Sequence, residues 1–223
     1  MDCGSQMINI IYEDNHLLIV EKPINIPVQE DESNDKDLLT ILKEYIKEKY
    51  NKPGNVYLGL VHRLDRPTGG LMVFAKTSKC ASRLSEQIRN NEMKKEYHVV
   101  LEGILKEKKE KLEDYLLKDE KSNIVSVNSK GKYSSLTYKV EKEIENYSLV
   151  KVHLETGRSH QIRVQFSSRG FPIYGDHKYN KNVKEKEQLA LFASYLSFKH
   201  PISKELLTFS LNLPNKGIWK LFI

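Results

Sequence analysis

The segment VHRLDRPTGG, at residues 61–70, holds the side chains best suited to chemistry. Asp65 has Arg63 two residues before it and Arg66 directly after it, and a pair of glycines follows at 69–70. A nearby guanidinium favours the charged form of a carboxylate, so an aspartate in a sheltered site can stay anionic. Such a group can act as a nucleophile or a base, and glycine lets a bulky group approach the backbone. The same residues also fit a surface ion pair before a glycine turn.

A second polar segment, TGRSHQIRVQFSSRGFPIYGD, occupies residues 156–176. It contains Arg158, His160, Gln161 and Arg163. If the segment is helical after its first residues, His160 and Arg163 lie on one face, three residues apart. That face could meet a carboxylate or phosphate groups. Taken alone, the segment fits a polar helix face equally well.

The arginines are concentrated near these two segments. Lys outnumbers Arg 29 to 7, yet every arginine lies between residues 63 and 169. Arginine offers a planar fork for carboxylate or phosphate that lysine lacks. The neighbourhoods 62–89 and 156–170 are therefore the places where binding geometry is expected to matter.

Several common site types are absent from the sequence. The protein-kinase catalytic loop has Asp directly after His-Arg and Asn five residues later, whereas Leu64 precedes Asp65 here and Gly70 stands at the later position. No phosphate-binding G-x-x-x-x-G-K-[ST] loop occurs. Cys3 and Cys80 are the only cysteines, and no zinc-type spacing is present. The sequence therefore predicts neither ATP chemistry nor a metal site.

Charge and hydropathy indicate the partner and the compartment. The net charge is +6, with 5 Lys/Arg against 11 Asp/Glu in residues 1–50 and 31 against 19 in residues 51–223. The basic part fits a polyanion, with nucleic acid first, or a lysine-rich solvated surface. No apolar run reaches the roughly 20 residues of a membrane span, and no secretory signal is visible. We therefore expect a reduced cytoplasmic protein that acts as a monomer.

The hydrophobic pattern predicts an α+β domain with adjacent strands. Residues 1–7 precede the first strand-like run and are expected to form a loose tail, with one catalytic domain over residues 8–223. Strands are predicted at 17–23, 70–76, 96–103, 133–142, 147–155, 189–201 and 206–211. Helices are predicted at 38–50, at 78–91 with Ser78 as N-cap, and at 159–170 closed by Gly170. The loop 24–37 is polar, and the charge-dense span 106–122 is expected to be a solvated insertion.

Taken together, the segments resemble the RluA family of pseudouridine synthases. The matching stretches follow in family order from about residue 8 to the end of the chain. They are KPINIPVQ (22–29), HRLDRPTGGLMVFAKT (62–77), KEYHVVLEG (95–103), ETGRSHQIRVQFSSRGFPIYGDHKY (155–179) and LALFASYLSFKHP (189–201). Many members carry an N-terminal S4 RNA-binding domain. With the first motif near residue 17, we expect none here.

The resemblance implies a large, mainly antiparallel mixed sheet with flanking helices and a central RNA-binding cleft. It implies isomerisation of a uridine in RNA, ribosomal or transfer, without a cofactor or a metal. Asp65 matches the catalytic aspartate, Tyr97 the tyrosine that packs on the target base, and Arg163 the arginine that pairs with the aspartate. Arg66 matches an arginine that helps open the RNA. The resemblance also assigns His62, Arg63, Arg158, His160 and Gln161 to RNA or substrate binding.

Some positions depart from the family pattern. Family members often have serine at the position of Gly69 and histidine at that of Phe171, and the stretch 202–205 differs from the usual turn. Asp65, Tyr97 and Arg163 are all retained. The alternative is a catalytically idle RNA-binding or ribosome-assembly module on the same fold.

Overall fold

The computed structural model describes residues 8–223 and divides into two compact units. The first unit comprises the chain up to Met93 together with Leu196–Phe209, and the second comprises Lys94–Tyr195 and Ser210–Ile223. The predicted tail at 1–7 lies outside the described residues. One catalytic domain over residues 8–223 stays a prediction. Within residues 8–223, no helix has both the length and the apolar character that a membrane crossing requires.

The first unit is built on antiparallel strands. β1 (Asn9–Glu13) pairs with β2 (Leu17–Lys22), and β2 pairs with β4 (Gly69–Ala75) from Leu17↔Ala75 to Lys22↔Gly70. The short β3 (Gly59–Leu60) also pairs with β4. Residues of β4 are buried throughout, as are all but one of those in β2. The register places Lys22 directly beside the loop that carries Asp65.

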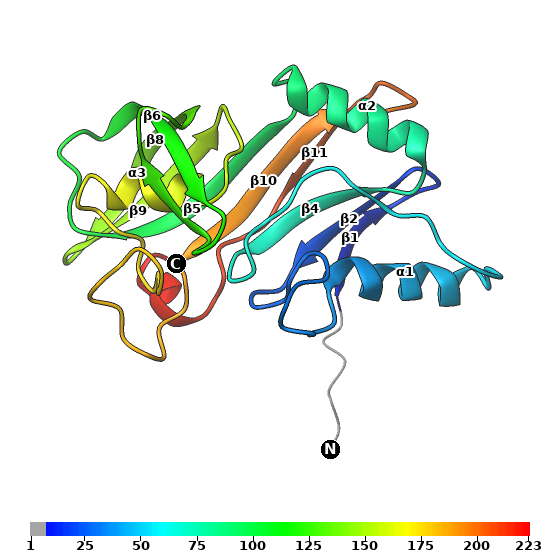
Figure 1. The fold of residues 1–223 in the computed structure, drawn as a ribbon, viewed down its shortest axis with the longest axis horizontal. Coiled ribbons are helices and arrows are strands. Elements are labelled where there is room, and N and C mark those ends of the chain that lie inside the picture. The colour runs from blue at the N-terminus through cyan, green and yellow to red at the C-terminus, as the bar shows by residue number, and fades with distance from the viewer. Residues whose placement is uncertain (1–7) are drawn as a thin grey trace. The chain divides into compact units, whose positions relative to one another are not determined.

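Two helices flank these strands in Figure 1. α1 (Leu38–Lys49) buries Leu38, Leu42 and Ile46, and Asp37 caps it by accepting from the Thr40 N–H. α2 (Ser78–Arg89) buries Cys80 and Leu84. Thr77, not Ser78, is its N-cap, because the Thr77 hydroxyl accepts from the Cys80 N–H. The predicted cap at Ser78 was therefore wrong by one residue.

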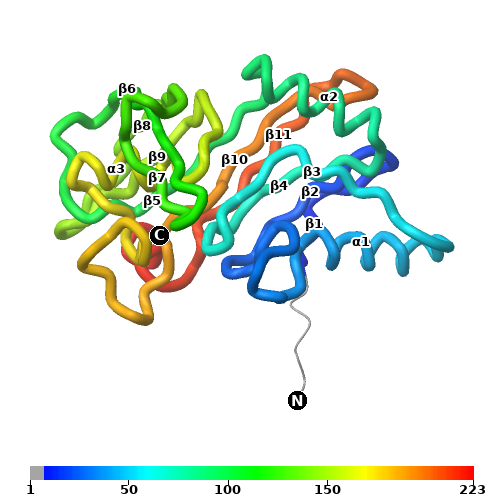
Figure 2. The backbone as a smooth tube through the Cα atoms, in the orientation of Figure 1, coloured from blue at the N-terminus to red at the C-terminus, as the bar shows by residue number. Residues whose placement is uncertain are grey.

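The second unit contains more strands, and those from β5 to β9 pair antiparallel with one another (Figure 2). Its hydrogen-bonded order is β10-β5-β9-β8-β6-β7. The strands are β5 (Lys94–Glu102), β6 (Lys109–Asp119), β7 (Ile124–Val127), β8 (Lys132–Ile144), β9 (Tyr147–Leu154) and β10 (Leu191–Lys199). β10 continues into the first unit at Leu196, where β11 (Leu206–Ser210) follows.

The predicted solvated insertion at 106–122 was wrong. Most of it is β6, which pairs with β8 from Lys109↔Lys139 to Leu116↔Lys132. Leu112 and Leu116 point to the buried face, while the residues between them are charged or exposed. The charge density therefore reflects the solvated face of a paired strand.

One short helix lies beside these strands. α3 (Gln161–Ser167) is shorter than the predicted 159–170, and Gly170 follows it with a left-handed φ of +83°. Phe166 of α3 packs edge-on against Tyr138 of β8, with ring centroids 5.4 Å apart. A short 3-10 helix, Gly217–Leu221, buries Trp219 near the end of the chain. The packing of Phe166 on Tyr138 fixes α3 against the sheet, and α3 carries Arg163.

Candidate functional site

Asp65 lies on a tight loop that a single lysine holds in place. The Thr68 N–H donates to the Asp65 carbonyl at 2.9 Å, which closes a turn. Lys22 is buried, and its Nζ donates to the carbonyl oxygens of Pro23, Arg66 and Thr68 at 3.0, 3.0 and 2.8 Å. All three protons of an ammonium group are thereby used. The loop geometry around Asp65 therefore depends on Lys22.

The surroundings of Lys22 shift its pKa. Burial lowers the pKa of Lys22 to about 7, with the negative charge of Asp65 raising it and the positive charge of Arg66 lowering it. Three carbonyl acceptors need three N–H donors, so the protonated form satisfies the loop fully. Lys22 belongs to the KPINIPVQ motif, but the sequence alone predicts no role for it.

The two glycines after the loop serve the chain's own packing. A Cβ at Gly69 would lie 3.1 Å from the Lys22 carbonyl oxygen and 3.1 Å from Ile24 Cγ2. Gly70 has φ of +120°, a conformation that side chains disfavour. The close neighbour of Gly69 is thus the chain segment at Lys22–Ile24.

The remaining candidates of the first unit have different environments. The Nε2 of His62 accepts from the Val73 N–H at 3.0 Å, which ties the start of the loop to β4. Arg63 is exposed. Arg66 contacts the acidic loop that follows β2. Its Nη1 donates to Ser33 Oγ at 2.7 Å and lies 3.6 Å from Asp31 Oδ2, and its Nη2 pairs with Asp35.

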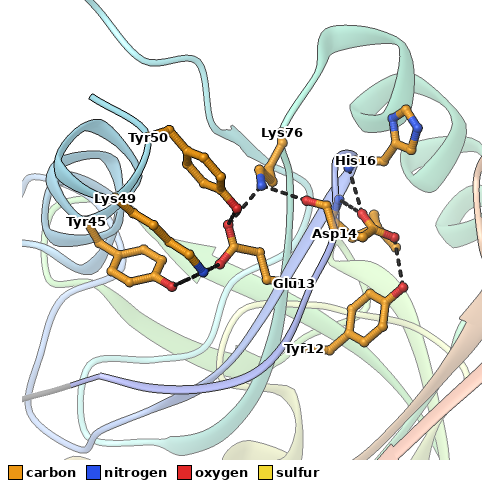
Figure 3. Close-up of polar contacts among 9 residues, drawn as sticks. Tyr12, Glu13, Asp14, His16, Tyr45, Lys49, Tyr50 and Lys76 are labelled. Atoms are coloured by element: carbon orange, nitrogen blue, oxygen red, sulfur yellow. Dashed lines mark hydrogen bonds and ion pairs between the residues drawn. The ribbon is translucent and has the colours of Figure 1, made fainter. Parts of the chain in front are cut away.

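A separate polar cluster lies around Glu13, at the end of β1 (Figure 3). The Glu13 carboxylate accepts from Lys49 and Lys76 Nζ and from the hydroxyls of Tyr45 and Tyr50, at 2.7 to 2.9 Å. Burial raises the pKa of Glu13, but these four donors together lower it to about 2. The cluster ties α1 to β1 and to the end of β4, so its role is architectural.

In the second unit, Arg163 is buried and paired with an acid that the sequence analysis did not single out. The Nε and Nη2 of Arg163 donate to Asp176 at 2.8 and 2.6 Å. Burial raises the pKa of Asp176. The Arg163 hydrogen bonds and charge, with the N–H groups of Lys178 and Tyr179, more than offset this and lower it overall. Asp176 is therefore an ionised, fully buried anchor for Arg163.

Tyr97 lies on β5 opposite Val152 of β9, and only 7% of its surface is exposed. Val99 and Leu101 lie on the same face of β5 as Tyr97, and both are buried. The ring is therefore set into a well-packed part of the sheet.

The three polar residues at the start of α3 have distinct contacts. Gln161 is buried. Its Oε1 accepts from the Arg158 N–H and the Thr156 hydroxyl, and its Nε2 donates to Ser135 O and Gln165 Oε1. It thus holds the turn before the helix. Arg158 is exposed and donates through Nε to the Tyr133 carbonyl.

His160 is the N-cap residue of α3, in a left-handed conformation with φ of +51°. The prediction that His160 and Arg163 share a helix face was wrong, because His160 precedes the first helical residue. Both residues contact Tyr179 instead. His160 Nδ1 lies 2.6 Å from the Tyr179 hydroxyl, and the Arg163 guanidinium lies 5.1 Å from the centre of the Tyr179 ring. Tyr179 lies in the YGDHKY stretch of the fourth motif, but the sequence alone predicts no role for it.

The structure thus groups the candidates by unit. His62, Arg63, Asp65 and Arg66 share the loop before β4, whereas Arg158, His160, Gln161 and Arg163 surround the start of α3. Residues 8–223 contain no cluster of three His, Cys, Asp or Glu side chains placed to hold a metal ion. Within the first unit, a carboxylate on a loop held by a buried lysine fits acid–base or nucleophilic chemistry on a polar substrate.

Comparison with known proteins identifies the family. The protein-family model described as RNA pseudouridylate synthase matches residues 16–168 of this chain. Ribosomal large subunit pseudouridine synthase C of Buchnera aphidicola (subsp. Acyrthosiphon pisum) is 34% identical over 203 residues, covering 86% of this chain and 63% of that protein. Ribosomal large subunit pseudouridine synthase D of Zymomonas mobilis is 33% identical over 221 residues, covering 93% and 69%. The chain thus spans 63% and 69% of the length of these two relatives.

Solved structures confirm the fold. Human RNA pseudouridylate synthase domain containing 4 matches with a TM-score of 0.78 at 22% identity, covering 92% of this chain and 88% of the other. Human RNA pseudouridylate synthase domain containing 1 matches with a TM-score of 0.76 at 23% identity, covering 95% and 86%. The predicted α+β class, with a mixed sheet and flanking helices, is confirmed, and the RNA-binding cleft stays a prediction.

Proposed function

The chain belongs to the RNA pseudouridylate synthase family, and on that basis we propose that it isomerises uridine in RNA to pseudouridine with Asp65 as the catalytic carboxylate. The observation that carries this proposal is the Asp65 loop, whose backbone a buried lysine fixes through three carbonyl oxygens. Asp65, Tyr97 and Arg163 all lie within the matched residues 16–168. Catalytic groups need such fixed support to reach a reactive geometry.

The reaction breaks the N1–C1′ bond, turns the base and joins C5 to C1′. A base inside a helix is unreachable, so the uridine must be flipped out at a cost of a few kcal/mol. Stacking on an aromatic ring such as Tyr97 offsets about 1–3 kcal/mol of that cost. Asp65 acts as a nucleophile at C1′ or C6, or as a base toward the 2′ proton. Tyr97 assists loss of the C5 proton, and N1 gains a proton in the product.

The remaining candidates support the catalytic aspartate or bind RNA in this proposal. Arg163 pairs with Asp65 and keeps it anionic, while Arg66 helps to open the RNA. His62, Arg63, Arg158 and His160 contact RNA, and Gln161 supports them by holding the turn. No cofactor takes part.

We propose structured RNA as the substrate, with ribosomal RNA of the large subunit first and transfer RNA second. The first choice comes from the relatives, several of which are named for ribosomal large subunit modification. The net charge of +6 supports a polyanionic partner. We propose a cytoplasmic monomer.

Mapping pseudouridines across the transcriptome, with and without this gene, tests the function and identifies the target. Loss of pseudouridine at one or a few uridines is expected, with recovery on adding back the wild-type gene. An Asp65→Asn gene should not restore the modification. An idle RNA-binding module would leave every pseudouridine in place, while other phenotypes of the deletion would be rescued equally by both genes.

A further inference from the structure

Tyr179 contacts two of the candidate site side chains, Arg163 and His160. Its ring lies under the Arg163 guanidinium, 5.1 Å from ring centre to the carbon of that group. Its hydroxyl oxygen lies 2.6 Å from His160 Nδ1, and the two rings meet nearly edge-on at 69°. One tyrosine thus touches an arginine through its face and a histidine through its hydroxyl.

Tyr179 is itself held at several points. Its hydroxyl accepts from the Val125 N–H at 2.9 Å, and its own N–H donates to Asp176 Oδ1 at 3.2 Å. Its ring packs against the apolar cluster of Leu116, Val125 and Val164. A side chain fixed at the backbone, the ring and the hydroxyl has little rotational freedom left. Tyr179 can therefore restrain the two side chains that contact it, Arg163 and His160.

The Arg163 guanidinium is consequently restrained in two directions. Asp176 binds it along one edge through Nε and Nη2, and Tyr179 covers one flat face. Bidentate pairing fixes the plane of the group, and the cation–π contact fixes its tilt.

His160 is restrained by the same tyrosine. Its backbone adopts a left-handed φ of +51°, which costs energy for a residue other than glycine. The contact at Nδ1 sets the ring orientation and hence the direction of Nε2.

We propose that Tyr179 is a positioning residue for the RNA isomerisation, with its ring aligning Arg163 and its hydroxyl aligning His160 toward the bound uridine. This inference rests on the proposed function. Tyr179 acts through the two side chains it holds and does not touch the reacting atoms. Asp176 binds both residues, because it accepts from the Arg163 guanidinium and from the Tyr179 backbone N–H.

Tyr179→Phe tests the hydroxyl while keeping the ring under Arg163. The single-turnover rate at saturating RNA should fall about tenfold, because small displacements of a substrate-binding group are costly. RNA affinity should change by less than about threefold. In a His160→Gln background the same change should cost less than about twofold, since the side chain through which the hydroxyl acts is already gone.

Tyr138→Phe is the matched control. Tyr138 lies on β8 in the same unit, and its hydroxyl donates to the Glu107 carbonyl and to Glu110. Its removal also breaks a hydroxyl contact in the same unit, but it should leave the rate unchanged in both backgrounds. A fall in rate from general loosening of the unit would affect both tyrosine variants.

A second measurement does not depend on activity. The imidazole ¹⁵N shifts of His160, assigned by comparison with His160→Gln, should move in Tyr179→Phe and stay in place in Tyr138→Phe. Unmoved shifts, or rate losses that add fully in the double variant, would overturn the inference. A wild-type chain that turns over no RNA would count against the proposed function instead, while the shifts would still report on the Tyr179 contact.

Discussion

Arg66 and Arg163 come from the two arginine-rich segments, but the structure gives them opposite environments. The Arg66 side chain is 38% exposed and pairs with acids on a surface loop, among them Asp35 at 56% exposed. The Arg163 side chain is 6% exposed and pairs with Asp176, which is fully buried. Exposed ion pairs contribute about 0–1 kcal/mol and exchange partners readily, whereas breaking a buried pair costs about 3–5 kcal/mol.

The difference separates two ways of using an arginine. Arg163 is a fixed part of the protein, with its direction set before RNA arrives. Arg66 is held by Asp31, Ser33 and Asp35, and RNA phosphates can replace these partners at little cost. The predictions that follow test that contrast and the buried polar groups beside it, from the largest expected effect to the smallest.

Arg163→Met should have the largest effect. We expect a loss of about 100-fold or more in single-turnover rate, as for other fixed charged donors at reaction sites. It should also destabilise folding by several kcal/mol, because Asp176 is left buried without its partner. Arg163→Lys should keep part of the rate, since lysine supplies the charge but not the planar fork. Rates at saturating RNA and urea unfolding measure the two effects.

A double variant separates stability from catalysis. Arg163→Met with Asp176→Leu replaces the buried pair by apolar side chains and should recover part of the stability, because the Lys178 and Tyr179 N–H groups lose their acceptor, but none of the rate. Recovery of the rate as well would show that Arg163 serves only the fold.

Lys22→Met tests the support of the Asp65 loop. Three carbonyl oxygens lose their donor, so the loop should loosen and the rate should fall about tenfold. RNA binding should change little. Protease cleavage near residue 66, compared with the wild type, reports loop opening independently. A variant with wild-type rate and an unchanged cleavage pattern would contradict the assigned role.

Glu13→Gln tests a buried polar cluster outside the site (Figure 3). The variant should lose about 1–3 kcal/mol of unfolding free energy at neutral pH and keep its rate. The pKa of Glu13 is lowered from 4.5 to about 2, so the stability it contributes is present above about pH 4.5 and lost as the pH falls toward 2. The difference between wild type and variant should therefore shrink over that range. A constant difference from pH 7 to pH 2 would contradict the lowered pKa.

Arg66→Gln should have the smallest effect. We expect KM to rise about threefold, with kcat and thermal stability nearly unchanged, because the lost ion pairs are exposed. The slope of log affinity against log salt should fall by about 1. Asp35→Asn should change affinity in the opposite direction, since it removes a competitor for Arg66. A large loss of kcat in Arg66→Gln would remove the contrast with Arg163.

Local patterns predicted much of the fold because they follow from burial. The apolar run of β2 and the helical spacing of Leu38, Leu42 and Ile46 determine their elements directly. β6 was missed because its charged face dominates its composition, and only pairing with β8 makes it a strand. The N-cap of α2 was misplaced because Thr77 and Ser78 are both suitable caps, and backbone geometry decides between them.

The site was predicted through motifs, and its supports were not. Lys22 lies 44 residues from Arg66, and Asp176 lies 13 residues from Arg163. No local rule connects such distant residues. Lys22 reads as a solvated cation, and Asp176 and Tyr179 as parts of a turn. Only the tertiary structure shows that these side chains hold the candidate substrate-binding groups in place.

Release of tritium from RNA labelled at C5 of uridine, by the purified wild-type chain and by Asp65→Asn, tests the central claim most directly. The substitution keeps the shape of the side chain and removes its charge. The wild-type chain should release tritium and form pseudouridine. Asp65→Asn should release none, while it binds the same RNA within about threefold of wild type in a gel-shift assay. Release by Asp65→Asn at a rate near that of the wild type would contradict the account.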